Sequence, residues 1–243
     1  MMKILYIDGG HVLHENHMYP YYGGVYRELL NLASVTTYQG FVGNINSFLS
    51  YLDQDFDCII FGLGYFANGS INWYSKIEGL SELTIPTVAM LNEKLEFCRI
   101  NKIKILVDPD ITYKKYAARV GALPFRTWYT ADPTIFHPRD IQKKYDIGFS
   151  GALHGGGKLK GPAKDVRPRV GELLQSNKSY KIFWNGSDSV SPRITNIEEY
   201  ATKINESKAW LSTSGPLGIL GPRYFEIMMS KTLLVCNEMP LQY

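Results

Sequence analysis

The sequence predicts an α/β protein with two domains, and three observations support this prediction. Short apolar runs, typical of strands covered on both faces, alternate with segments of helical period. Such alternation favours doubly wound layers of parallel strands and helices. Near residue 130 the pattern gives way to a stretch with two prolines and no clear period, and then starts again. The length of 243 residues suits one large or two small domains. We therefore expect domains at 1–135 and 143–243, the second being short for a complete domain.

In the first half, four apolar runs are expected to be strands and four further segments to be helices. The expected strands are 3–7, 56–63, 84–91 and 102–108. The expected helices are 21–33, 45–54, 69–80 and 112–122. Val25, Leu29 and Leu30 share one face of the first helix, and Gly121 is a typical residue to close the last one.

The second half repeats the alternation after an irregular linker at 129–144. The expected strands are 145–151, 180–186, 208–214 and 232–236, and the expected helices are 167–176, 196–207 and 222–230. Proline is favoured at the first helical position, where its missing N–H costs nothing. The last helix is therefore expected to begin at Pro222.

Composition narrows the classes of function. The net charge of +3 is too small to predict a nucleic-acid partner. No apolar run is long enough for a signal peptide or a membrane span. Three cysteines cannot all pair, and Cys58 and Cys236 lie in apolar, strand-like runs. We therefore expect reduced, buried thiols in a cytoplasmic protein with no transmembrane segment.

The loop at 214–221 and the helix after it form the first candidate binding site. Its glycines allow close backbone approach, and loops of this kind lie at the sheet edge where ligands bind. Arg223 and Glu226, three residues apart, would share one face of a helix whose N-terminus attracts anions. Arginine suits a phosphate, and a carboxylate suits vicinal hydroxyls such as those of a ribose. A surface ion pair beside a glycine loop explains the same spacing.

A second glycine loop, at 149–158, follows the first strand of the second half. It lacks the spacing of a P-loop, because only the tripeptide Gly155–Gly157 precedes Lys158. Between His137 and Arg169, eight lysines and arginines outnumber three acidic residues. This excess could focus an anionic ligand into a cleft. A solvated basic loop is the alternative for most of these lysines.

Other polar clusters give less specific signals. His11, His14 and His17 are spaced by three, but the segment is loop-like and completes no recognisable metal set, so no metal is expected. A histidine beside the first strand could act as a general base or be an ordinary loop residue. Asp108 and Asp110 could hold a divalent cation that bridges a diphosphate, although similar pairs occur elsewhere in the chain.

Four segments together resemble the GT-B glycosyltransferases, most of all those with a CgeB-type C-terminal domain, and more distantly family 4 enzymes. They are the glycine pair in "YPYYGGVYRELLNLA", the passage "YKKYAARVGALPFRTWYTADPTIFHP", the strand and loop "KKYDIGFSGAL", and the element "PRYFEIMMSKTLLVCNE". The resemblance implies two Rossmann-like domains facing across a cleft. It also implies that a nucleoside-diphosphate sugar binds there, mainly to the second domain.

The resemblance further implies roles for the matching residues. Glu226 would accept hydrogen bonds from the ribose hydroxyls of the donor, which requires its carboxylate to face the groove rather than a packed core. The residues expected near the diphosphate are Arg223, Gly215, Gly218, Gly221, Ser150, Gly151 and, from the first domain, Gly23 and Gly24. Lys158, from the basic loop, is counted with these donor-binding residues.

The chain departs from the family in one respect that bears on catalysis. Retaining family 4 enzymes carry Glu-x7-Glu, and Gly218 stands where the first glutamate is expected. In inverting GT-B enzymes a base from the first domain deprotonates the acceptor hydroxyl. The candidates for this base are His11 and Asp8, which lie beside the first strand. The resemblance implies a metal-independent transfer from the donor to a hydroxyl acceptor, with no cofactor. Two alternatives stay open: a non-catalytic nucleotide-sugar-binding module, and a metal-dependent GT-A transferase using Asp108 and Asp110.

Overall fold

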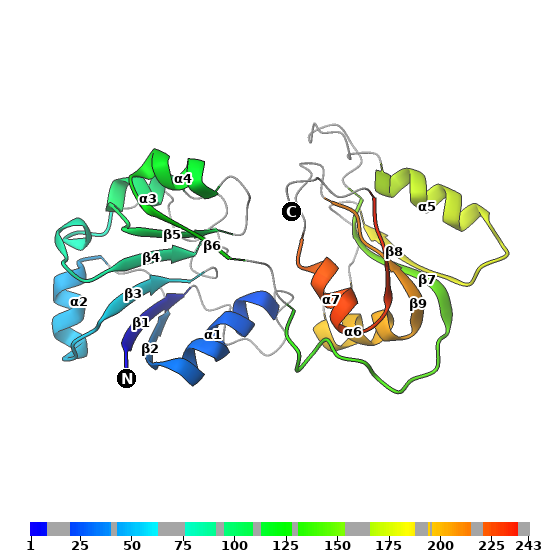
Figure 1. The fold of residues 1–243 in the computed structure, drawn as a ribbon, viewed down its shortest axis with the longest axis horizontal. Coiled ribbons are helices and arrows are strands. Elements are labelled where there is room, and N and C mark those ends of the chain that lie inside the picture. Colours follow the sequence, from blue (N-terminus) through cyan, green and yellow to red (C-terminus); the bar gives the residue numbers. More distant parts are fainter. Residues whose placement is uncertain are drawn as a thin grey trace. The chain divides into compact units, whose positions relative to one another are not determined.

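The structure, a computed structural model, describes residues 1–8, 20–39, 43–62, 76–90, 95–108, 113–127, 131–153, 166–187, 194, 196–214 and 221–237. The chain divides into two units. The first comprises Met1–Glu15 and Tyr22–Trp128, and the second comprises Asn16–Tyr21 and Tyr129–Tyr243. Each unit contains a parallel sheet whose strands alternate with helices (Figure 1). The prediction of an α/β protein with parallel sheets is therefore confirmed.

The first unit is built on a six-stranded sheet with the order β2-β1-β3-β4-β5-β6, and all its strand pairs are parallel. The strands are β1 (Lys3–Asp8), β2 (Ser34–Gln39), β3 (Cys58–Phe61), β4 (Thr87–Met90), β5 (Ile105–Asp108) and β6 (Leu123–Arg126). The helices are α1 (Pro20–Leu32), α2 (Ile45–Leu52), α3 (Leu95–Asn101) and α4 (Tyr113–Val120), with a short 3₁₀ helix η2 (Leu80–Glu82). The order of strand addition reverses between β1 and β3. Ligands of open α/β sheets bind beyond the carboxyl ends of the strands at such a point.

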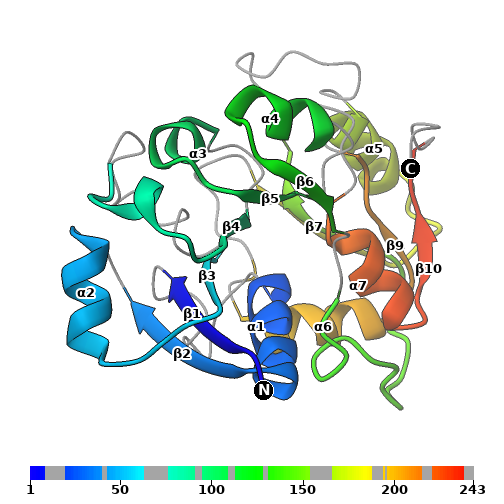
Figure 2. The same ribbon diagram turned by 60° about the vertical axis from the view of Figure 1, so that its left-hand side comes forward.

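Alternate side chains of β1 pack on opposite faces of this sheet, as strand geometry requires. Leu5 and Ile7 belong to a core that includes residues of α2, α3 and α4. Ile4 and Tyr6 belong to a second core, which residues of α1 cover. Figure 2 shows α1 beside β1 and β2, and α4 next to β5 and β6. Both faces of the central strands are thus buried, which explains their continuous apolar runs.

The second unit has a four-stranded parallel sheet with the order β10-β9-β7-β8. The strands are β7 (Tyr145–Ala152), β8 (Ile182–Ser187), β9 (Ser207–Leu211) and β10 (Leu233–Val235), and the helices are α5 (Val166–Ser176), α6 (Ile197–Asn205) and α7 (Arg223–Met229). Pro222 was expected to be the first residue of the last helix. It is instead the N-cap of α7, and the helix begins at Arg223. In this sheet the order of strand addition reverses between β7 and β9.

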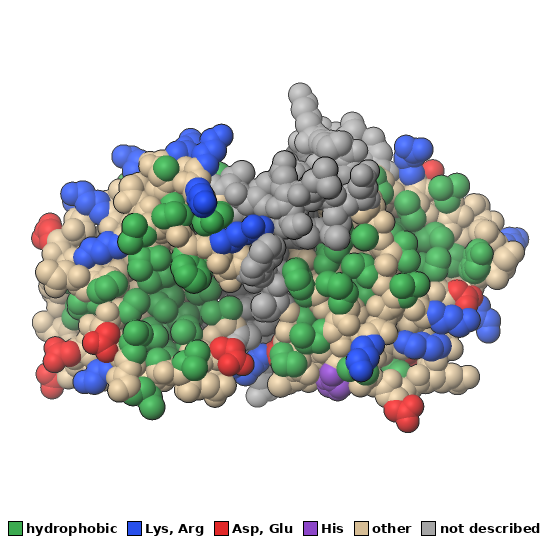
Figure 3. Space-filling view, in the orientation of Figure 1, with side chains coloured by type: hydrophobic (Ala, Val, Ile, Leu, Met, Phe, Trp, Pro, Cys, Tyr) green, Lys and Arg blue, Asp and Glu red, His purple; other side chains and the backbone are tan. Residues whose placement is uncertain are grey.

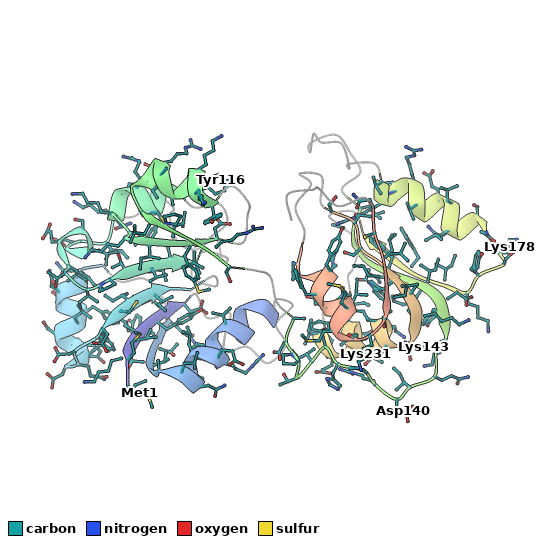
Figure 4. The ribbon with its side chains drawn as sticks, viewed as in Figure 1. Met1, Tyr116, Asp140, Lys143, Lys178 and Lys231 are labelled. Atoms are coloured by element: carbon teal, nitrogen blue, oxygen red, sulfur yellow. The ribbon has the colours of Figure 1, made fainter. Side chains whose placement is uncertain are left out.

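The segment expected to be a linker packs against the second unit. Its described part contains neither helix nor strand, as the sequence predicts. Phe136 is fully buried and its ring lies 6.0 Å from that of Tyr200 in α6. Lys143, labelled in Figure 4, donates hydrogen bonds to the backbone carbonyls of Asn205 (2.8 Å) and Ser207 (2.9 Å). These contacts anchor the segment that leads into β7.

The sequence did not predict three of the elements, β2, β6 and α3, and each omission has a physical reason. β2 and β6 are the edge strands of the first sheet, and edge strands do not need to be apolar on both faces. β2 is largely half-exposed, and β6 carries Pro124 between the exposed Leu123 and Phe125. α3 has seven residues, too few for a helical period to become visible.

Two further expectations are corrected. The helix expected at 69–80 is wrong in its described part, because residues 76–79 are not helical and Leu80 begins η2. Cys236, expected to be a buried thiol, lies just after β10 and is exposed, whereas Cys98 is buried and Cys58 is half-buried.

The surface of the described residues carries mixed charges. On the face shown in Figure 3, lysine and arginine side chains are spread over both units, with acidic side chains among them. Within the part of the chain that the structure describes, no helix combines the length and apolarity needed to cross a membrane.

Gly148 in β7 offers a test of the core of the second unit. A Cβ atom there would lie 2.3 Å from Trp210 Cε3 and 2.6 Å from Ser207 Oγ, so Gly148→Ala forces the fully buried indole to move. We expect this overpacking to lower the free energy of unfolding by about 1–3 kcal/mol in urea denaturation. Gly221→Ala is the matched control, because a Cβ at Gly221 meets no atom within 4 Å. Equal stability of the two variants would contradict this packing.

Candidate functional site

Polar residues of the second unit gather at the carboxyl end of its sheet. Ser150 and Gly151 lie near the end of β7, and Thr213 follows β9, the neighbouring strand. These residues therefore mark the point where the strand order reverses. Ser150 is buried, and its Oγ lies 3.3 Å from Oδ1 of Asn185, its partner in β8. The location agrees with the edge at which the sequence analysis expected a ligand.

Arg167, in the first turn of α5, ties the ends of β7 and β9 together. Its Nη1 donates a hydrogen bond to the carbonyl of Ala152 (2.6 Å), and its Nε and Nη2 donate to Oγ1 (2.7 Å) and the carbonyl (3.2 Å) of Thr213. The side chain is only 8% exposed. Burial, and then the charge of Arg223, lower the pKa of Arg167 to about 10. A guanidinium stays charged at that value, so a positive charge is buried here.

Arg223, at the start of α7, brings a second guanidinium to the same place. A Cβ atom at Gly151 would lie 2.5 Å from Arg223 Nη1 and 2.9 Å from its Cζ. Only a glycine leaves room for the guanidinium to rest against the end of β7. The structure thus brings together two residues that were each expected near a diphosphate, and that role stays a prediction.

Glu226 lies one turn further along α7, and it is buried rather than open. Its residue is 4% exposed, and its Oε2 has no hydrogen-bond partner among the described residues. Burial raises its pKa to about 7, while the Arg223 charge and the hydroxyl of Tyr200 act in the opposite direction. Tyr200 is itself buried, and burial, followed by the Glu226 charge, raises its pKa. The expectation that this carboxylate faces a groove is thus not met in the described residues.

The chain that leaves β9 is anchored to Asn237, which follows β10. The backbone N–H of Ser214 donates to Oδ1 of Asn237 (2.9 Å), and Asn237 Nδ2 donates to Ser214 Oγ (2.9 Å). Together with the bonds from Arg167 to Thr213, these contacts fix the chain at the entrance to the loop.

Some predicted residues lie outside the described part of the chain, so their assignments stay predictions. These are His11, His14, His17, Asp110, Lys158, Gly215 and Gly218. In the first unit, Asp8 ends β1 and Asp108 ends β5, and each is 1% exposed. Gly23 and Gly24 lie within α1. Among the described residues, no three His, Cys, Asp or Glu side chains are grouped so that they could hold a metal ion.

Sequence reasoning singled out neither Arg167 nor Tyr200. Arg167 was one of eight basic residues in a run with no feature to separate it from its neighbours. Tyr200 lies on the apolar face of α6, where it looks like an ordinary core residue. A signal for Arg167 is available in retrospect, since it opens the helix after a glycine loop at the end of a strand.

No known family matches this chain, and no curated protein is found to be related to it. Two guanidinium groups, a carboxylate and a tyrosine hydroxyl meet at one edge of a parallel sheet. Such a set can bind an anion and accept a hydrogen bond from a neutral hydroxyl.

The buried carboxylate predicts a pH-dependent effect of Glu226→Gln on stability. The pKa of Glu226 is about 7 in the folded chain against an ordinary value of 4.5, so the folded state binds more protons between these values. Wild-type stability is therefore lost as the pH rises through this window. The variant avoids that loss, and we expect it to gain up to about 3 kcal/mol on wild type above pH 7 and nothing below pH 4.5.

Urea denaturation of both proteins between pH 4 and pH 8 measures this difference. Glu172→Gln, at an exposed position of α5, is the control and should follow wild type throughout. A stability difference between Glu226→Gln and wild type that does not change with pH would disprove the assignment.

Proposed function

We propose that this protein is a glycosyltransferase of the GT-B type. In this proposal it moves a sugar from a nucleoside-diphosphate donor, such as a UDP- or GDP-sugar, to a hydroxyl acceptor without a metal. The donor would bind between two Rossmann-like domains, expected at 1–135 and 143–243. The second unit supplies most of the donor contacts.

One observation carries the proposal more than any other: the Arg223 guanidinium rests against Gly151 where the strand order reverses, with Glu226 one turn away. Positive side chains at this edge suit the diphosphate, whose charge increases when the sugar leaves. A carboxylate at the distance of one helical turn suits the ribose hydroxyls. The parallel α/β architecture of both units is compatible with this arrangement.

The burial of Glu226 sets a condition on the proposal. Oε2 is the carboxylate oxygen without a described partner, so it is the acceptor that a ribose hydroxyl would use. Donor binding must then replace the groups that now cover this oxygen. A hydroxyl donating to a buried carboxylate makes a stronger hydrogen bond than it would in water, since the local dielectric is low.

A second function, a nucleotide-sugar-binding module without catalysis, is favoured by two features. The buried carboxylate is not poised on an open surface, and Gly218 replaces the glutamate that retaining enzymes carry. A GT-A transferase built on Asp108 and Asp110 has less support, because Asp108 is buried at the end of a strand in the first sheet. Loss of donor binding in EDTA would favour the GT-A alternative.

Screening donors by thermal shift and nucleotide release separates these functions. A ligand at 100 times its dissociation constant stabilises the folded state by about 2.7 kcal/mol, which a thermal shift detects. UDP, GDP, ADP and their sugars form the panel. Release of the nucleoside diphosphate in the presence of hydroxyl acceptors supports the transferase. Binding with no release, across all acceptors supplied, supports the module.

Glu226→Ala should weaken donor binding, because it removes the proposed acceptor for the ribose hydroxyls. Hydrogen bonds to charged groups contribute about 1.5–3 kcal/mol, so we expect a loss of roughly 10- to 100-fold in affinity. Isothermal titration with the donor found in the screen measures it, and circular dichroism verifies the fold. Glu172→Ala, on the exposed side of α5, is the matched control. Unchanged affinity in a folded Glu226→Ala variant would remove Glu226 from the donor site.

A further inference from the structure

Arg167 has an electrostatic environment that its hydrogen bonds do not explain. All three of its described acceptors are neutral oxygens, from Ala152 and Thr213. Among the described residues, no carboxylate lies within salt-bridge distance of it. A buried charge without a counter-ion costs several kcal/mol even after the protein relaxes. No described residue offsets this cost, which arises where the strand order of the second sheet reverses.

Arg223 adds to that cost instead of relieving it. Its charge is close enough to Arg167 to make the second positive charge less favourable there. Glu226 is the described carboxylate that interacts with Arg223, but the two do not form an ion pair within 4.0 Å in the described residues. Within the described part of the site, two buried or half-buried cations thus face one carboxylate that burial makes reluctant to ionise.

Arg167 has more N–H donors than its described acceptors use. A guanidinium carries five N–H groups in a rigid fork, and three of them serve Ala152 and Thr213. Two N–H groups, one on each terminal nitrogen, have no acceptor among the described residues, and guanidinium N–H groups bind phosphate oxygens strongly. The same three hydrogen bonds hold the fork rigid, so little entropy is lost when a ligand binds.

We propose that Arg167 and Arg223 together form a two-arginine site for a phosphate dianion or a diphosphate, in which Arg167 is a direct ligand-binding residue. The identity of the ligand as part of a nucleotide sugar rests on the proposed function, but its charge does not. Inorganic pyrophosphate and the diphosphate of a nucleotide share the chemistry that the site recognises.

Isothermal titration of the full chain with inorganic pyrophosphate, at constant ionic strength, tests the proposal. We expect wild type to bind pyrophosphate, and Arg167→Met and Arg223→Met each to bind it roughly 10- to 100-fold more weakly. Arg169→Met, on the exposed side of the same helix, removes the same charge and should stay within about twofold of wild type. The proposal is overturned if wild type does not bind pyrophosphate. It is also overturned if the folded Arg223→Met variant binds pyrophosphate as tightly as wild type.

Thr213→Val separates ligand binding from a purely structural role of Arg167. This variant removes one acceptor of the Arg167 tie and keeps both positive charges. It should retain pyrophosphate binding much better than Arg167→Met does. If it loses as much affinity as Arg167→Met, then Arg167 acts by positioning the strand ends and does not bind the anion. Arg223→Met leaves every described hydrogen bond of Arg167 in place, so it tests the site even if Arg167→Met fails to fold.

Parallel titrations with UDP, GDP and their sugars keep this inference apart from the proposed function. Pyrophosphate binding that depends on both arginines, without binding of any nucleotide sugar, upholds the two-arginine site and rejects the transferase. The opposite result is also possible: the protein turns over a nucleotide sugar, but Arg167→Met binds pyrophosphate and nucleotides as tightly as wild type. That result upholds the transferase and rejects the two-arginine site.

Discussion

The buried guanidinium of Arg167 is the interaction on which the candidate site depends. It joins the carbonyl end of β7 to the chain that leaves β9, and these two strands flank the reversal of strand order in the second sheet. Buried arginines are usually neutralised by a carboxylate, because an unpaired charge in a low dielectric is costly. Here the hydrogen bonds satisfy three donors while leaving the charge uncompensated by described residues. The strand ends are therefore held in place by a group that still attracts an anion.

Glu226 places a limit on how that attraction is used. If this carboxylate ionises, it offsets part of the positive charge of Arg223, and if it is protonated, the site is more positive but can donate a hydrogen bond. Its pKa of about 7 puts both states within reach near neutrality. The buried carboxylate interacts with Tyr200, whose ring contacts Phe136 and Trp210, so the charged site borders the aromatic core of the second unit. A phosphate bound to the arginines would favour the protonated acid by repulsion.

Much of the architecture follows from local sequence, and the site follows only in part. Central strands such as β1 and β3 are covered on both faces, so their apolar runs predict them directly. The edge strands β2 and β6 lack that constraint and were missed. Ser150, Gly151 and Thr213 share an edge because parallel strands end together, which sequence order alone implies. The contact of Arg167 with Thr213 joins residues 46 apart, and the burial of Glu226 results from the packing of α7 against α6. Neither is visible in any local pattern, because tertiary packing decides both.

Anion binding and sugar transfer make different demands on the chain, and the described residues bear on them unequally. Binding needs the two arginines and the strand ends, all of which belong to the second unit. Transfer also needs a group that takes a proton from the acceptor, and of the two candidates in the first unit only Asp8 is described. Asp8 is 1% exposed at the end of β1, where its charge adds to burial in raising the pKa of Tyr6. A carboxylate so enclosed cannot reach an acceptor hydroxyl unless the residues around it move. Of the two predicted bases, His11 therefore stays the better candidate, because the imidazole of a histidine ordinarily titrates near neutral pH.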